Sequence, residues 1–128
     1  MPVDYAWYDD TQHAIRLTAL GEWSWLDYHR AMRMALFLLV NIDHQVDTVI
    51  DFTRSARMPG GAIAHLRSLA KRQHQNLSGR AVVIGLSGEW RARVAGSEAA
   101  EQFQVGDQTV YFVDDSSAAA ALLARLRV

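Results

Sequence analysis

The stretch VIDFTRSARMPGGAIAHLRSLAKR, residues 49–72, decides the fold. It begins as an apolar strand that ends at Asp51, continues as a loop that carries arginines, and enters a helix after Pro-Gly-Gly. The strand is part of the run VDTVIDF at 46–52, which lacks a clean alternation of polar and apolar residues. Strands with this character are covered on both faces and are usually parallel. The stretch therefore predicts a buried central strand that leads directly into a helix over 60–73.

Two later runs have the same apolar, β-branched or aromatic character, RAVVIGL at 80–86 and TVYFVDD at 109–115, and we expect both to be strands. The segment between them has the spacing of a short, weak helix around Trp90 and Val94. The final segment, SSAAAALLARLRV, has serines for an N-cap, alanines for helix propensity and arginines near its C-terminus. It predicts a last helix.

The first twenty residues predict a β-hairpin, because apolar residues alternate with polar or small ones on both sides of a turn at 9–12. A helix is expected from Ser24 to about Asn41, with Ser24 as its N-cap and Asp27 in its first turn. The second half of this helix is apolar nearly all round. One face should meet the sheet, and another should meet either a second helix of the same domain or a second copy of the chain.

The expected order is β-β-α-β-α-β-α-β-α. Strands that alternate with helices predict an α/β fold with a mixed sheet, made of an N-terminal hairpin plus parallel strands, and about four helices. The length of 128 residues suits one domain, and we expect residues 1–128 to form it.

Composition excludes several classes of function. The chain has no cysteine, so disulfides, thiolate metal sites and cysteine nucleophiles are excluded. The formal net charge of −1 gives no overall attraction to nucleic acid. The longest apolar run, at 34–40, is far shorter than the roughly 20 residues of a membrane span. We expect a cytoplasmic protein without stable membrane insertion, nucleic-acid partner, metal or cofactor.

The charges are unevenly distributed along the chain. Residues 52–88 contain no acidic residue and carry a formal charge of +6, so the remainder carries −7. If this segment forms one surface, an anion could bind where the strand ends and the helix begins. The residues that would form this candidate anion site are Thr53, Arg54, Arg57, Gly60 and Gly61. Alternatively, Pro-Gly-Gly is only a tight corner and the arginines are a solvated surface.

The sequence contains no catalytic constellation. GLSGEW at 85–90 lacks the spacing of a nucleophile elbow, and Asp51 at a strand end more often bonds to the following loop than acts as an acid or base. The five histidines show no metal-binding spacing. Exposed aromatic residues are enriched at protein interfaces, and at most one of Trp23 and Trp25 is expected in the core. The residues of the candidate interface are Trp23, Trp25, Leu36 and Trp90.

The order of elements, the GEWSWLDY opening of the first helix and the VIDF…MPGGA turn resemble the STAS domains, and more closely the bacterial SpoIIAA-like (STAS/SEC14-type) group. In the anti-sigma-factor antagonists of this fold, the resemblance implies a phosphorylated serine at the start of the helix after this strand. The matching positions here fall near Pro59, Gly60 and Gly61, which have no hydroxyl. The antagonist's phosphorylation switch is therefore missing.

Two functions follow as hypotheses. The first is a non-enzymatic STAS-like regulatory module in bacteria that acts through protein–protein interaction or self-association. The second is a domain that binds a small anionic or amphipathic, lipid-like ligand through the loop and helix N-terminus at 54–61.

Overall fold

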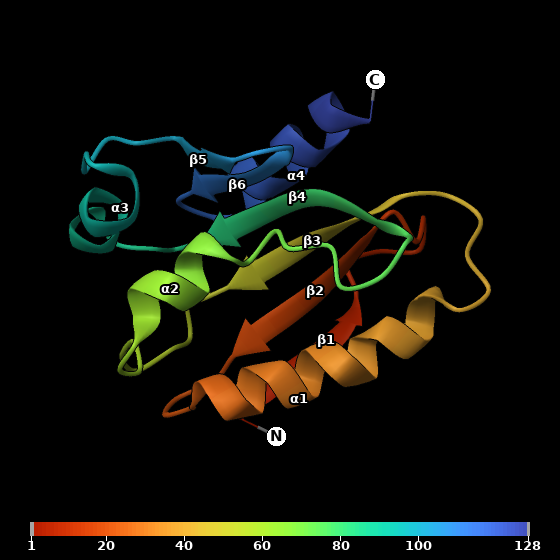
Figure 1. Cartoon of the computed structure of the whole chain (residues 1–128), viewed down its shortest axis with the longest axis horizontal. Helices are drawn as coiled ribbons and strands as arrows, with labels where there is room; N and C mark the ends of the chain where they lie inside the picture. The colour runs from red at the N-terminus through yellow and green to blue at the C-terminus, as the bar shows by residue number, and fades with distance from the viewer. Residues whose placement is uncertain (1, 128) are drawn as a thin grey trace.

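A mixed six-stranded sheet forms the centre of the molecule, with the strand order β1-β2-β3-β4-β6-β5 (Figure 1). β2, β3, β4 and β6 are parallel neighbours, and β1 and β5 close the two edges in antiparallel pairs. In this computed structural model, which describes residues 2–127, the strands are β1 (Val3–Trp7), β2 (Ala14–Ala19), β3 (Val46–Asp51), β4 (Leu77–Ile84), β5 (Gln102–Val105) and β6 (Gln108–Val113). The predicted α/β fold, hairpin and parallel strands are confirmed.

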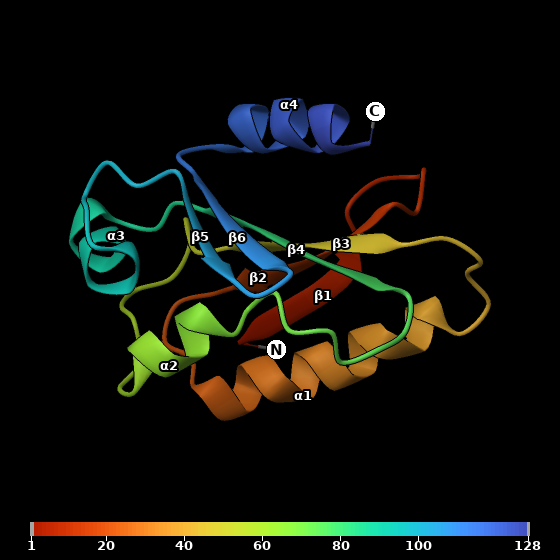
Figure 2. The same ribbon diagram turned by 45° about the horizontal axis from the view of Figure 1, so that its top comes forward.

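Four α-helices cover the sheet unequally. They are α1 (Trp25–Leu36), which continues as the 3-10 helix η1 (Phe37–Leu39), α2 (Ala62–Arg67), α3 (Gly88–Ala95) and α4 (Ser116–Leu126). α1 and α2 lie on one face of the sheet and α4 lies alone on the other (Figure 2). Buried residues of α1, α2 and α3 share the larger hydrophobic core, whereas only Ala119 and Leu123 of α4 are buried in the smaller one. The part of the second face formed by β1 and β2 is therefore left without a helix.

The central strand is β3, as the opening stretch predicts. Residues 46–50 are all buried, and β3 pairs with β2 on one side and β4 on the other. Val46 and Ile50 face the larger core, while Val49 faces α4 together with Val82 and Ile84 of β4. Because both faces are covered, the strand has apolar residues at consecutive positions.

The predicted start of α1 is also confirmed. The Ser24 hydroxyl accepts a hydrogen bond from the Asp27 N–H, 3.1 Å, and the Asp27 carboxylate accepts one from the Ser24 N–H, 2.9 Å. These reciprocal bonds form a capping box, which satisfies two N–H groups that the first helical turn would otherwise leave unpaired.

Three predictions about elements were wrong in part. The strand β5 was not predicted, since its four residues include only Phe103 and Val105 as apolar positions and three of the four are exposed. The helix expected over 60–73 spans only Ala62–Arg67, and turns follow it through Ala70. The first helix ends as η1 at Leu39 rather than near Asn41.

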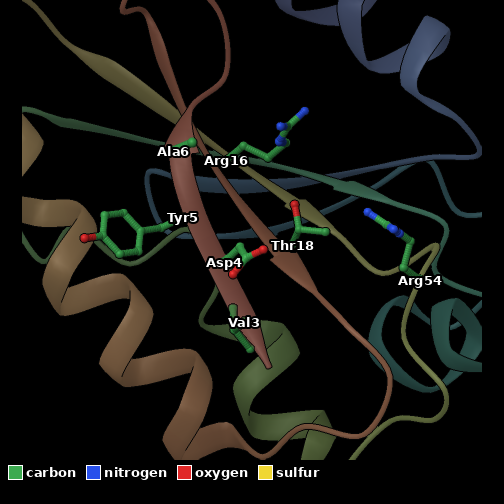
Figure 3. Close-up of a pocket in the computed structure, with 7 residues that line it drawn as sticks. All are labelled: Val3, Asp4, Tyr5, Ala6, Arg16, Thr18 and Arg54. Atoms are coloured by element: carbon green, nitrogen blue, oxygen red, sulfur yellow. The ribbon is translucent and has the colours of Figure 1, made fainter. Parts of the chain in front are cut away.

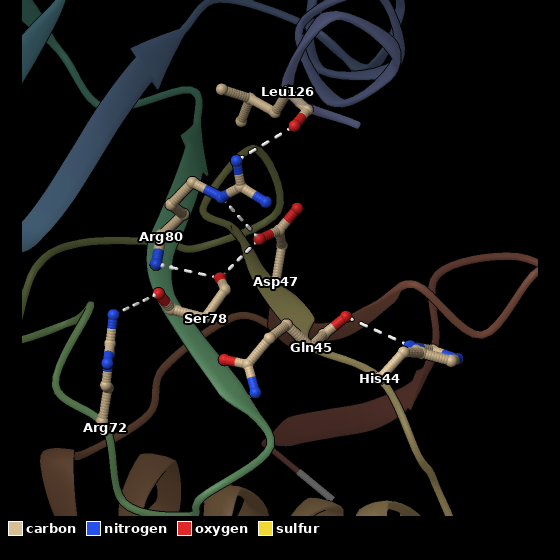
Figure 4. A network of polar contacts seen from close by, with 7 residues as sticks. All are labelled: His44, Gln45, Asp47, Arg72, Ser78, Arg80 and Leu126. Atoms are coloured by element: carbon tan, nitrogen blue, oxygen red, sulfur yellow. Dashed lines mark hydrogen bonds and ion pairs between the residues drawn. The ribbon is translucent and has the colours of Figure 1, made fainter. Parts of the chain in front are cut away.

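An ion pair between a buried aspartate and a half-buried arginine links α4 to the sheet (Figure 4). Asp47 of β3 is 3% exposed, and its carboxylate accepts hydrogen bonds from the Arg80 Nε–H, 3.0 Å, and from the Ser78 hydroxyl. Arg80 Nη1 donates a second bond to the Leu126 carbonyl in the last turn of α4, 3.0 Å. One arginine therefore neutralises a buried carboxylate and caps the helix C-terminus.

No helix within residues 2–127 combines the length and the apolar character that crossing a membrane requires.

Candidate functional site

The loop after β3 is held by hydrogen bonds at its start and around Arg54 and Ala56. The Asp51 carboxylate accepts bonds from the N–H of Thr53, 2.8 Å, and from the Thr53 hydroxyl, 2.6 Å. Farther along, the Gly21 N–H donates to the Arg54 carbonyl, and the Ala56 N–H donates to the Gly21 carbonyl. Asp51 thus bonds to its own loop, which confirms the structural interpretation of this residue.

The five residues of the candidate anion site do not converge. Arg54 lines a hollow on the α4 side of the sheet, whereas Arg57 lines a different hollow beside Pro59 and Gly60. Arg57 also forms an exposed ion pair with Glu22, 3.4 Å. Arg54 and Arg57 therefore do not line one common hollow.

The chain makes a tight turn immediately before α2. Gly61 occupies the N-cap position with a φ of 75°, in the left-handed region, and supplies no side-chain cap. Glycine is preferred there because other residues are strained at positive φ. With only six residues, α2 has a weak dipole, and we do not assign an anion site to its N-terminus.

Apolar and basic side chains surround this corner at the carboxyl ends of β3 and β4. Met58 lines three adjoining hollows here, and two of these also include Trp90 of α3. The Arg93 guanidinium lies over the Trp90 ring, 4.9 Å from its centroid, and pairs with Glu89, 3.5 Å. Trp90 is partly exposed to solvent, unlike the other two tryptophans of the candidate interface.

The prediction that at most one of Trp23 and Trp25 is in the core was wrong. Trp23 is 8% exposed and Trp25 is 7% exposed. Trp23 stacks on Phe52, 5.6 Å between ring centroids, and donates its Nε1–H to the Ser55 hydroxyl, 2.7 Å. The two tryptophans meet edge to face because the chain bends around the N-cap between them. Trp23 thus holds the loop after β3 in place, and neither tryptophan is a free interface. Leu36, the fourth candidate, is half-buried against the same core.

The outer face of α1 carries most of the exposed large hydrophobic residues of the described chain. Of the five large hydrophobic residues exposed in the described chain, four lie along α1, η1 and the residue after them: Leu26, 53%, Met34, 46%, Phe37, 72%, and Val40, 64%. Their spacing places them on one side of the helix. Arg30 and Arg33 lie on the same side. We call these six residues the α1 outer face.

A groove of about 350 Å³ lies between α1 and α2, and no pattern in the sequence predicts it. The imidazole of His65 stacks on Trp25, with ring centroids 4.4 Å apart and planes 11° apart, and lies 5.1 Å from the ring of His29. Burial, and to a smaller extent the neighbouring His29, lowers the pKa of His65. The residues that line the groove are Tyr28, His29, Ala64, His65, Ser68, Leu69, Lys71 and Gln73.

This groove predicts a pH dependence of stability. The unfolded chain keeps the ordinary histidine pKa of about 6.5, whereas the folded state lowers the pKa of His65. As the pH falls through about 6.5, the histidine of the unfolded chain takes up a proton, whereas His65 of the folded chain stays neutral until a lower pH. The free energy of unfolding therefore decreases. We expect His65→Gln to show a smaller decrease between pH values of about 7.5 and 5.5, measured by urea unfolding. The control His44→Gln, outside the groove, should keep the wild-type decrease, and an unaltered decrease in His65→Gln would contradict the interpretation.

Within residues 2–127, no group of three or more His, Cys, Asp and Glu side chains could hold a metal ion.

Comparison of the chain with protein-family models, with curated proteins and with solved structures finds no match in any of the three. The resemblance to STAS domains therefore stays a prediction.

Proposed function

We propose that this protein is a non-enzymatic binding module that associates with a second copy of itself through the α1 outer face. The observation that carries the proposal is the clustering of exposed apolar residues there, with Phe37 72% exposed and Val40 64% exposed. Single exposed hydrophobic residues are ordinary on a protein surface, but a contiguous apolar patch with a polar border is typical of an interaction site.

The charges around the patch favour a second copy as the partner. Among residues 2–127, Arg30, Arg33 and Asp43 have no ion-pair partner. In a two-fold contact the same surface is used by both copies, so residues at opposite ends of the patch meet. Arg30 lies seven residues before Phe37, and Asp43 lies six residues after it. Asp43 lies in the loop that follows η1. We propose an antiparallel packing about Phe37 in which Arg30 of each copy meets this loop aspartate of the other.

The size of the surface sets the strength of the association. The 12 residues of α1 extend over roughly 18 Å, because an α-helix rises about 1.5 Å per residue. A strip of this length and one helix wide is smaller than the roughly 800 Å² that each partner contributes to a stable interface. We therefore expect a reversible dimer with a dissociation constant in roughly the micromolar range.

Phe37→Glu is expected to raise this dissociation constant at least about 100-fold, because each of the two copies carries a charge into the apolar contact. Sedimentation over a series of protein concentrations measures the effect. Phe37 is largely exposed, so thermal unfolding should change little. Val105→Glu is the matched control, since Val105 is the fifth exposed large hydrophobic residue and lies on β5, away from α1.

The charge pairing has a separate test. Arg30→Asp and Asp43→Arg should each weaken the dimer, and the two substitutions together should restore it. A strict monomer at high concentration of the wild-type chain would refute the proposal, as would an equal loss of association in Val105→Glu and Phe37→Glu.

A further inference from the structure

A hollow of about 330 Å³ lies on the part of the sheet that α4 leaves uncovered (Figure 3). β1 and β2 form its floor, and Arg54 reaches it from the loop after β3. The hollow is lined by Val3, Asp4, Tyr5, Ala6, Arg16, Thr18 and Arg54.

The pleat of the two strands determines which side chains enter the hollow. Asp4 pairs with Thr18, and Ala6 pairs with Arg16, so these four side chains lie on one face of the sheet. In Figure 3 they point to the same side of β1 and β2, and Tyr5 points to the opposite side. The small side chain of Ala6 leaves room above the floor, and Thr18 lies between the side chains of Arg16 and Arg54.

The two arginines of the hollow have no acidic partner. Neither Arg16 nor Arg54 forms an ion pair or a side-chain hydrogen bond within residues 2–127, and the carboxylate of Asp4 in the same hollow is not paired with either one. Arg80 and Arg91, by contrast, are each bound to an aspartate. A guanidinium offers five N–H donors in a planar fork that matches an oxyanion. Two unpaired guanidinium groups therefore line one hollow, and their N–H groups are available as donors there.

Asp4 restricts the kind of anion. A bare anion bound by Arg16 and Arg54 would face the carboxylate of Asp4, which repels it. A ligand that carries a hydroxyl or amino group beside its anionic group would instead donate a hydrogen bond to Asp4. The volume of about 330 Å³ is near the lower limit of the roughly 300–1,000 Å³ found for ligand pockets, so the ligand is small.

We propose that this hollow binds a small organic oxyanion, a phosphate or a carboxylate, that carries a neighbouring hydroxyl or amino group. Arg16 and Arg54 hold the anionic group, the Thr18 hydroxyl donates a further hydrogen bond to it, and Asp4 accepts from the neighbouring donor. The site differs from the one that the sequence predicted, because Arg54 acts with Arg16 of β2 rather than with Arg57 and the two glycines.

The test is a titration of the ¹⁵N-labelled full chain, followed by amide chemical shifts. The probes are glycerol 3-phosphate, glycerate, inorganic phosphate and uncharged glycerol. We expect shifts at residues 4–6, 16–18 and 53–55 with at least one of the first two probes and none with glycerol. Binding of glycerol 3-phosphate alone assigns a phosphate ligand, and binding of glycerate alone assigns a carboxylate. If neither shifts these residues, the proposal is refuted.

Variants separate this site from a general attraction of anions. Arg16→Gln and Arg54→Gln should each weaken binding of the better probe at least about tenfold, whereas Arg33→Gln, an unpaired arginine on the α1 outer face, should not. Asp4→Asn should strengthen binding of inorganic phosphate and reduce the preference for the hydroxyl-bearing probe. An equal loss in Arg33→Gln and Arg16→Gln would overturn the proposal. Phe37→Glu should bind normally, so failure of the dimer and failure of this site are distinguishable.

Discussion

Replacing Arg80 with alanine is expected to lower the free energy of unfolding by about 3 kcal/mol. The substitution removes the only cation paired with the Asp47 carboxylate among residues 2–127, and the Asp47 side chain is 4% exposed. A buried charge that loses its partner costs far more than the pair itself contributes. The Leu126 carbonyl at the end of α4 also loses its donor. Urea unfolding of the wild type and the variant measures the difference.

Two comparisons show whether burial is the cause. Arg57→Ala breaks an ion pair whose side chains are 79% and 75% exposed, and it should cost less than about 1 kcal/mol. In an Asp47→Ala background, Arg80→Ala should cost about 1 kcal/mol, since no carboxylate is then left unpaired. A full loss of about 3 kcal/mol in that background would show that Arg80 acts through α4 alone.

Gly85→Ala is expected to destabilise the fold by about 3 kcal/mol for two reasons. Gly85 has a φ of +81°, which strains any residue with a Cβ, and that Cβ would lie 2.7 Å from the Thr53 methyl carbon and 3.3 Å from the Thr53 backbone nitrogen. Thr53 cannot easily move away, because the Asp51 carboxylate binds both its N–H and its hydroxyl. Thermal or urea unfolding gives the loss.

The other glycines of this region separate strain from crowding. Gly61 has a φ of +75°, and no atom lies within 4 Å of the position that an alanine Cβ would take there. Gly61→Ala should therefore lower the free energy of unfolding by about 1 kcal/mol through backbone strain alone. Gly60 has neither a positive φ nor a near neighbour, and Gly60→Ala should change stability by less than about 0.5 kcal/mol. Thr53→Ser removes the methyl group while keeping the hydroxyl, so it should recover part of the loss in Gly85→Ala. No recovery would show that the close contact is not the cause.

Sequence patterns correctly predicted the elements that are buried on both faces or that are held by hydrogen bonds between residues close in sequence. The apolar run at 46–52 predicts β3 because both faces of that strand are covered, and Ser24 with Asp27 predicts the start of α1 because the capping box is local. β5 has no such signal, since it pairs with β6 at an exposed edge where apolar residues are not required. The helix predicted over 60–73 was too long, because the apolar residues Leu69 and Ala70 are buried from a turn rather than from a helix.

The surfaces on which the two proposals rest were less predictable, because they depend on contacts between residues distant in the sequence. The grouping of Arg16 with Arg54 requires β2 and β3 to be neighbours and the loop after β3 to turn toward the α4 side. The stacking of His65 on Trp25 requires α2 to lie against α1. The exposed apolar face of α1 was accessible to sequence analysis, since its residues repeat within one helix. The sequence could not predict whether a second helix covers that face, because this depends on how the whole chain packs.

The arrangement of the sheet also has a consequence for how the chain folds. The two edge pairs, β1 with β2 and β5 with β6, join strands that are close in sequence and can close quickly. The three central pairs are parallel, and each joins strands separated by a helical connection. Closing such long loops consumes entropy before the contacts repay it, which slows folding. We therefore expect the two edge hairpins to form early and the pairing of the central strands to limit the folding rate.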